Sequence, residues 1–174
     1  PSMVRLTALG IEQVPAVVRE AAGVIAYQSG NFAEALNDLR TVRRMRGGDD
    51  LLPLIADCER GLGRPQKALD VIKQVGDRKI APEIRSELLI VAAGARADMG
   101  KLDAAIVTLQ VPELTKLSPG TPRARMQYAY ADLLLQAGRI NEAWEWMERA
   151  AGSDIDGETD AAERCEEFHG ITFT

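Results

Sequence analysis

Residue types able to carry out acid–base or nucleophilic chemistry are few in this chain. His169 is the only histidine and follows Phe168 near the end of the sequence. Cys58 and Cys165 are far apart and lack the short Cys-x-x-Cys or Cys/His spacings of structural zinc sites. Because catalysis needs a convergent set of acid, base and nucleophile, we expect no catalytic residues, no bound metal, no cofactor and two reduced thiols.

Two short patterns partly match known ligand loops. The stretch Gly94–Lys101 has two glycines and a lysine, but five residues separate the glycines instead of four, and Leu102 stands where a phosphate loop has Ser or Thr. In the acidic stretch Asp154–Asp160, Gly157 comes two positions too early for an EF-hand calcium loop. We therefore predict a helix end for the first stretch and a turn leading into a capped helix for the second.

The net charge of −5 is concentrated at the C-terminal end of the chain. From Ala151 onward the sequence has one arginine, Arg164, and no lysine. The same segment has seven acidic residues: Asp154, Asp156, Glu158, Asp160, Glu163, Glu166 and Glu167. The remainder is close to neutral, which gives no general electrostatic reason to expect nucleic-acid or membrane-surface binding.

One local exception is a group of four arginines. Arg40, Arg43, Arg44 and Arg46 lie near the predicted end of a helix, where cations complement the exposed carbonyl groups. The alternative to a capping role is a basic ridge that contacts RNA, and with it a regulatory or RNA-contacting function for the protein.

The elements that must position these residues are predicted to be helices. Apolar residues make up 46% of the chain and aromatics only 5%, and Ala, Leu, Val and Ile dominate, as in closely packed helices. No apolar run approaches the roughly 20 residues of a membrane span, and no basic-then-apolar leader opens the sequence. These features predict a cytoplasmic protein without a membrane partner.

An internal repeat organises most of the sequence. Four segments fit the pattern Gly-x-apolar/Pro-x-x-Ala: Gly30–Ala35, Gly63–Ala68, Gly100–Ala105 and Gly138–Ala143. Each Ala is followed by an apolar residue and by another three positions further on, which places all three on one helical face. A small residue, Gly23, Ala56, Ala93 or Ala131, precedes each Gly by seven positions. The pattern predicts helix hairpins that turn at the glycines and cross at small side chains.

With these offsets the chain resembles the tetratricopeptide repeat family from about Ala16 to Ala150. The resemblance implies an all-α, right-handed stack of antiparallel helix pairs, an α-solenoid of about four repeats with a terminal helix at each end. Two departures limit it. Arg19, Leu52, Leu89 and Gln127 stand where the family has a Trp, and the glycines are spaced by 33, 37 and 38 residues against the family norm of 34.

The repeat divides the chain into three expected parts. Residues 1–15 are predicted to form a leading helix left from an upstream repeat, so that the natural protein would extend beyond Pro1. Residues 16–150 hold the four helix pairs, and 112–122 is the clearest loop between them. Residues 151–174 form an acidic capping helix and tail, with Trp146 expected to pack under this helix, against Phe168. Segments 56–63, 128–132 and 156–163 are also similar to actinobacterial tetratricopeptide proteins, a similarity that brings no assigned activity.

The family resemblance implies that the first helices of the pairs line a concave groove that holds a partner. The residues at matching offsets are Tyr27, Gln28, Asp57, Arg60, Asp98, Tyr128, Asp132 and Gln136. Tyr128 is the best single anchor, with packing inside the stack as its alternative role. Glu20 and Val24 replace the Lys and Asn of the chaperone-tail clamp, so a different ligand is expected. We predict a scaffold or interaction module that binds a protein or peptide, is not an enzyme, and can self-associate; the partner's identity stays open.

Overall fold

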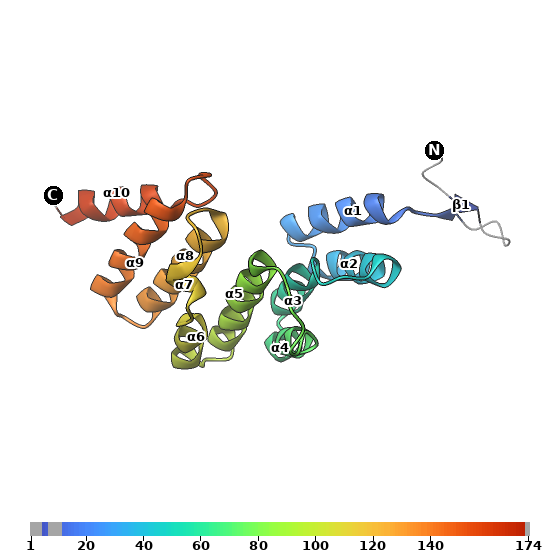
Figure 1. Ribbon diagram of the computed structural model, residues 1–174, viewed down its shortest axis with the longest axis horizontal. Coiled ribbons are helices and arrows are strands. Elements are labelled where there is room, and N and C mark those ends of the chain that lie inside the picture. The colour runs from blue at the N-terminus through green and yellow to red at the C-terminus, as the bar shows by residue number, and fades with distance from the viewer. Residues whose placement is uncertain (1–4, 7–11, 173–174) are drawn as a thin grey trace. The chain divides into compact units, whose positions relative to one another are not determined.

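The computed structural model describes the backbone of residues 5–6 and 12–172 and the side chains of residues 14–170. The chain divides into two compact units, 1–79 and 80–174. The expected all-α class is confirmed, since helices account for nearly all the regular structure of the described residues (Figure 1).

The first unit contains two helix hairpins. Its helices are α1 (Ala16–Gln28), α2 (Phe32–Arg46), α3 (Leu52–Gly61) and α4 (Pro65–Lys73). Helix α1 packs against α2, α2 against α3, and α3 against α4, so that neighbours in sequence are neighbours in space (Figure 1).

The second unit is also built from hairpins of successive helices. Its helices are α5 (Pro82–Asp98), α6 (Leu102–Leu109), α7 (Glu113–Lys116), α8 (Thr121–Gln136), α9 (Ile140–Ser153) and α10 (Ala161–Thr172). Helix α8 packs against α5, α6, α7 and α9, and α10 packs against α9. The expected acidic C-terminal helix is therefore present, and α8 is the element around which this unit is assembled.

The four repeated glycines end helices in the same way. Gly30, Gly63, Gly100 and Gly138 have φ angles between 74° and 77°. Each Gly N–H bonds to the carbonyl three residues earlier, and the next N–H bonds to the carbonyl five residues before it, as for Asn31 and Ala26 at 2.8 Å. This is the Schellman motif, which requires a left-handed residue that only Gly adopts without strain. The predicted hinges are confirmed, and the stretch Gly94–Lys101 is a helix end.

The small residues of the repeat lie where the paired helices cross. Ala35, Ala68, Ala105 and Ala143 are completely buried, as are Ala56 and Ala131, and Ala93 is 1% exposed. At Gly23 an added Cβ would lie 3.1 Å from the side chain of Leu39, closer than ordinary van der Waals contact. These positions must therefore stay small for the hairpins to close.

The described parts of residues 1–15 are not the expected leading helix. Most of this segment lies outside the described residues, and its described parts are two short strands, β1 (Arg5–Leu6) and β2 (Glu12–Gln13), paired antiparallel with Arg5 opposite Gln13. The sequence has Gly10 and the β-branched Val4, Thr7 and Ile11 here. Such a composition has low helix propensity, so the periodicity of a few apolar residues was an insufficient guide.

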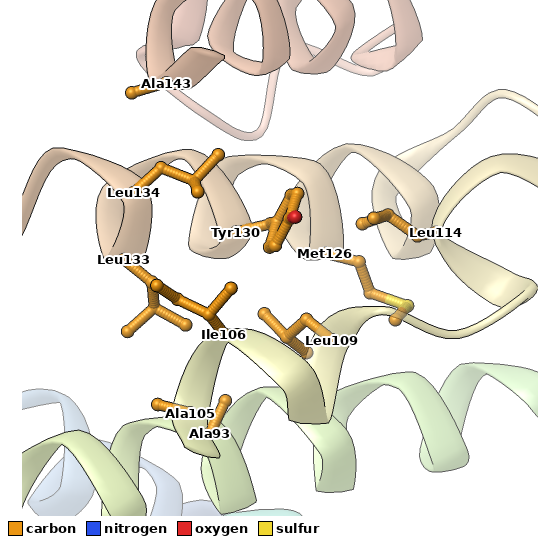
Figure 2. Close-up of a cluster of buried hydrophobic side chains, with 10 residues drawn as sticks. All are labelled: Ala93, Ala105, Ile106, Leu109, Leu114, Met126, Tyr130, Leu133, Leu134 and Ala143. Carbon is orange, nitrogen blue, oxygen red and sulfur yellow. The ribbon is translucent and has the colours of Figure 1, made fainter. Parts of the chain in front are cut away.

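The loop expected over 112–122 contains the short helix α7. Its Leu114 is 5% exposed and joins a core cluster with Met126 and Tyr130 of α8 (Figure 2). Figure 2 shows Ile106 and Leu109 of α6 facing the same α8 side chains. The inserted turn explains the wide spacing between Gly100 and Gly138, because it covers an apolar surface that a minimal loop would leave exposed.

A buried polar network fixes the ends of α7, α8 and α9. Gln127 of α8 is completely buried, and its Nε2 donates to the carbonyl of Leu114 at 3.0 Å. Ser153 donates its hydroxyl to Oε1 of Gln127 at 2.8 Å, and the N–H of Gly120 bonds to the carbonyl of Ser153 at 2.8 Å. Both ends of the Gln127 amide are thus paired, as a buried polar group requires.

Both tryptophans are half-buried and pack against the core cluster that includes Met147 of α9 and Ala161 of α10, but the ring that meets Phe168 is not the predicted one. Trp144, which follows the repeat alanine Ala143 on α9, stacks on Phe168 of α10 with ring centroids 4.2 Å apart and an interplanar angle of 17°. Trp146, expected to pack against Phe168, instead meets Tyr130 edge to face at 5.1 Å. The ring partner of Phe168 was wrongly predicted because the rotation of α9 about its axis depends on α8 and α10 together, which local spacing does not specify.

Candidate functional site

Three of the groove residues predicted in the first unit come together between α1 and α3. The hydroxyl of Tyr27 donates to Oδ2 of Asp57 at 2.5 Å, and Nη1 of Arg60 donates to Oδ1 of the same carboxylate at 2.9 Å. The Tyr27 ring also meets Phe32 edge to face at 6.0 Å. The fourth residue, Gln28, is exposed. The first-helix surface therefore presents an ordered aromatic and charged cluster.

A hollow of about 430 Å³ lies elsewhere in this unit and is bordered by arginines. Its lining residues are Arg40, Arg43, Arg44, Gly47, Gly48, Leu52, Ile55, Val71, Gln74 and Arg78. Three of the four arginines noted in the sequence thus face one space. Arg46 does not line it and instead pairs with Glu20 and Asp50, at 2.5 and 2.7 Å. Arg78, which follows α4, joins the group, and no local spacing in the sequence links it to α2.

Buried Glu59 lies next to this arginine group. The Glu59 side chain is 1% exposed and accepts hydrogen bonds from Arg40 and Arg64, both at 2.7 Å. A carboxylate removed from water needs such partners, and two arginines supply them here. Arg40 therefore has a structural role as well as a place on the hollow.

In the second unit, Tyr128 and Asp132 of α8 share one partner from α10. Nη1 of Arg164 donates to the Tyr128 hydroxyl and to Oδ1 of Asp132, both at 2.8 Å, and the guanidinium carbon lies 5.2 Å from the Tyr128 ring centroid. Arg164 was not among the predicted site residues. Its isolation among seven acidic residues was the available signal, since a lone base in an acidic segment is expected to have carboxylate partners.

The electrostatics of this cluster follow from its burial and partners. Burial and a hydrogen bond with Asp160 raise the pKa of Tyr128, an effect that Arg164 partly opposes. Burial disfavours the charge of Arg164, but the hydrogen bonds to Asp132 and Tyr128 outweigh it and the pKa of Arg164 is raised. At neutral pH the phenol of Tyr128 is therefore neutral and the guanidinium of Arg164 is charged.

A second hollow, of about 410 Å³, opens beside Tyr128 and Asp132. Its lining residues are Ile90 of α5, Arg125, Tyr128, Ala129 and Asp132 of α8, and Glu158, Thr159 and Asp160 of the segment before α10. Arg125 donates two hydrogen bonds to Glu87, at 2.5 and 3.0 Å. The other two residues predicted for this unit, Asp98 and Gln136, are exposed and do not line the hollow.

The acidic segment beside this hollow is the predicted turn. Asp154 accepts hydrogen bonds from the N–H of Glu158 and from the N–H and hydroxyl of Thr159, at 2.9, 2.8 and 2.7 Å. The Thr159 hydroxyl contributes most to lowering the pKa of Asp154. Asp156 accepts from the hydroxyl of Thr121 at 3.0 Å. These bonds fix the turn that presents Glu158 and Asp160.

The remaining chemically versatile residues are His169, Cys58 and Cys165. His169 lies on α10, half exposed, 3.3 Å from the carboxylate of Glu148. Burial is the main cause that raises the pKa of both the Cys58 and the Cys165 thiol. Among the described residues, no group of three or more His, Cys, Asp or Glu side chains could hold a metal ion. None of the described helices combines the length and apolar character of a membrane-crossing segment.

Comparison with known proteins gives a limited similarity. No protein-family model matches the chain. Protein FlbA of Caulobacter vibrioides is 43% identical to it over 58 residues, which make up 32% of this chain and 9% of FlbA. The chain thus spans a small fraction of the length of this curated relative, and the similarity concerns one short segment.

Proposed function

We propose that this chain is a tetratricopeptide-like helical repeat that holds a peptide segment or helix of a partner protein on the surface of its first helices. The proposed arrangement is a right-handed α-solenoid of four helix pairs. The observation that carries the proposal is the hollow bordered by Tyr128 and Asp132, two residues that the repeat register assigns to a binding groove. Support for the repeat comes from the four hinge glycines, which share one backbone geometry, and from the buried Ala that follows each hinge.

The residues that line this hollow are better suited to binding a peptide than to catalysing a reaction. Ile90 and Ala129 offer an apolar wall, and the Tyr128 ring adds a rigid aromatic surface with a polar tip, the combination common at protein interfaces. Its volume lies in the range of roughly 300–1,000 Å³ typical of sites that take a small ligand. We infer that one or two anchor side chains of the partner enter the hollow.

The charges around the hollow indicate which side chains of a partner would fit it. Asp132, Glu158 and Asp160 border the hollow together with a single base, Arg125. Arg125 is paired with Glu87, and Asp132 with Arg164. We therefore propose a partner segment that places a basic side chain beside an apolar one.

The test is selection of peptides from a random phage-displayed library on the immobilised chain, followed by affinity measurement with synthetic peptides. Ala129→Gln fills the hollow without removing a hydrogen bond, and Ala162→Gln makes the same substitution at an exposed position of α10. We expect the first variant to bind roughly tenfold more weakly, as for a hot-spot position, and the second to bind like the wild type.

Two results would contradict the proposal. One is the absence of any enriched peptide with saturable binding. The other is enriched peptides whose affinity is unchanged by Ala129→Gln while circular dichroism shows the variant to be folded. Turnover of a substrate that disappears with His169→Ala would instead favour an enzyme.

A further inference from the structure

The arginine-bordered hollow of the first unit has more guanidinium groups than carboxylates that pair with them. Five guanidinium groups lie at or next to it, those of Arg40, Arg43, Arg44, Arg64 and Arg78. Among the described residues, these five guanidinium groups pair with only two carboxylates, those of Asp49 and Glu59. Arg43 and Arg78 share Oδ1 of Asp49, at 3.5 and 3.0 Å, and Arg40 and Arg64 share Glu59.

Arg44 is the clearest case of an arginine at this hollow without a carboxylate partner among the described residues. Its Nη2 donates to the hydroxyl of Thr41 at 3.0 Å, a neutral acceptor, and the described residues supply it with no carboxylate. An exposed arginine that borders a hollow in this way retains most of its donors for an incoming anion.

Two other guanidinium groups are held in place by backbone carbonyls. Nε of Arg43 donates to the carbonyl of Gly48 at 3.1 Å. Arg78 donates from Nε to the carbonyl of Val75 and from Nη2 to that of Gln74, both at 3.1 Å. Side chains already ordered lose less conformational entropy when a ligand binds.

The floor and rim of the hollow affect how strongly these arginines attract an anion. Leu52, Ile55 and Val71 form an apolar floor, which reduces screening by water. Gly47 and Gly48, with φ angles of 76° and 88°, lie at the rim. No side chain lies within 4 Å of a Cβ built at Gly47, whereas a Cβ built at Gly48 would lie 3.2 Å from Oδ1 of Asp50. An anion can therefore approach the guanidinium groups over Gly47, where the rim carries no side chain.

We propose that this hollow binds a compact polyanion carrying a diphosphate group. Guanidinium groups pair with phosphate oxygens through parallel hydrogen bonds, and a diphosphate concentrates several negative charges within the reach of Arg43, Arg44 and Arg78. The volume of about 430 Å³ accommodates a small ligand. This binding is independent of the peptide site proposed above, which lies in the other unit.

The charge distribution favours a small anion over a nucleic-acid strand. Residues 1–79 contain twelve Lys and Arg against ten Asp and Glu, so the unit as a whole carries little surplus beyond this hollow. A strand of RNA needs a basic surface that follows several phosphates. Arg46, the arginine closest to extending such a surface along α2, is already paired with Glu20 and Asp50.

The test is isothermal titration of the full chain with inorganic pyrophosphate, at a constant ionic strength of about 0.15 M so that general screening does not change. Arg44→Gln removes a charge whose described partner is only a hydroxyl, so it should leave the fold intact. Arg46→Gln removes the same charge from the same helix outside the hollow. We expect saturable binding that weakens about tenfold in Arg44→Gln and less than about twofold in Arg46→Gln.

Further ligands distinguish the sources of the diphosphate. Equal affinity for pyrophosphate and ADP supports recognition of the diphosphate group itself, and tighter binding of ADP supports a nucleotide as its carrier. The proposal is overturned if pyrophosphate does not saturate the protein, or if Arg46→Gln weakens binding as much as Arg44→Gln. Binding of an oligoribonucleotide or an aspartate-rich peptide without binding of pyrophosphate would also overturn it.

Discussion

Phe168 of α10 stacks on Trp144 of α9, with nearly parallel rings whose centroids lie 4.2 Å apart. This pair joins the acidic C-terminal helix to the last helix hairpin, together with the bonds from Arg164 to Tyr128 and Asp132. The position of α10 matters for the proposed peptide site because the segment that precedes this helix borders the hollow.

We expect Phe168→Ala to weaken the attachment of α10. The side chain is half-buried, so loss of its stacking and apolar contact should lower the free energy of unfolding by roughly 1–2 kcal/mol. Hydrogen exchange of α10 amides and urea unfolding measure the effect. Glu166→Ala, at an exposed position of the same helix, is the control and should stay within about 0.5 kcal/mol of wild type. Equal exchange protection in the two variants would show that the stack does not hold α10.

Cys58 should make the protein less stable in alkali. Burial, followed by the charges of Asp57 and Glu59, raises the pKa of this completely buried thiol from 9.0 to about 11. A raised folded-state pKa means that the native state keeps a proton which the unfolded chain releases above pH 9. The contribution to stability is therefore complete below about pH 9 and is lost as the pH rises through 11.

The measurement is urea unfolding of wild type and Cys58→Ala at a series of pH values. Between pH 9 and 11 the wild type should lose up to roughly 1.4 kcal/mol per pH unit more than the variant, the value for one proton. Parallel stability curves in this window would mean that the thiol titrates alike in the folded and unfolded states.

The hinge geometry predicts opposite effects for one substitution at two glycines. Gly63→Ala places a Cβ at a φ of 74° and should cost about 1–2 kcal/mol of stability. Gly152→Ala, in the last turn of α9, should instead stabilise by about 0.4–1 kcal/mol, because Ala loses less backbone entropy in a helix. No atom lies within 4 Å of the added Cβ at either site, so packing does not confuse the comparison. Thermal unfolding of both variants checks the prediction, and a Gly63→Ala protein as stable as wild type would refute it.

The candidate site could be predicted from sequence only as a set of helix faces. The repeat register placed Tyr27, Asp57 and Arg60 on first helices, and the structure joins them through hydrogen bonds. The same register placed Asp98 and Gln136 in the groove, yet they lie outside the hollow that contains Tyr128. Offsets identify which side of a helix a residue occupies, but the depth of a surface depends on the neighbouring elements.

The arginine group was also predicted only in part from the sequence. Its members on α2 were evident from their spacing, and a helix end was a reasonable place for them. That Arg46 turns to Glu20 and Asp50, while Arg78 approaches Asp49 across 29 positions of sequence, follows from the packing of α1, α2, α3 and α4.

The sequence by itself determined the helix hairpins, because a left-handed Gly and an apolar face with a 3.6-residue period are local properties. It therefore predicted the hinges at Gly30, Gly63, Gly100 and Gly138 and the small residues at the helix crossings. Only the tertiary structure decided which tryptophan meets Phe168, which partner Arg164 takes and where hollows open. These features depend on the rotation and approach of whole helices, which many distant side chains set together.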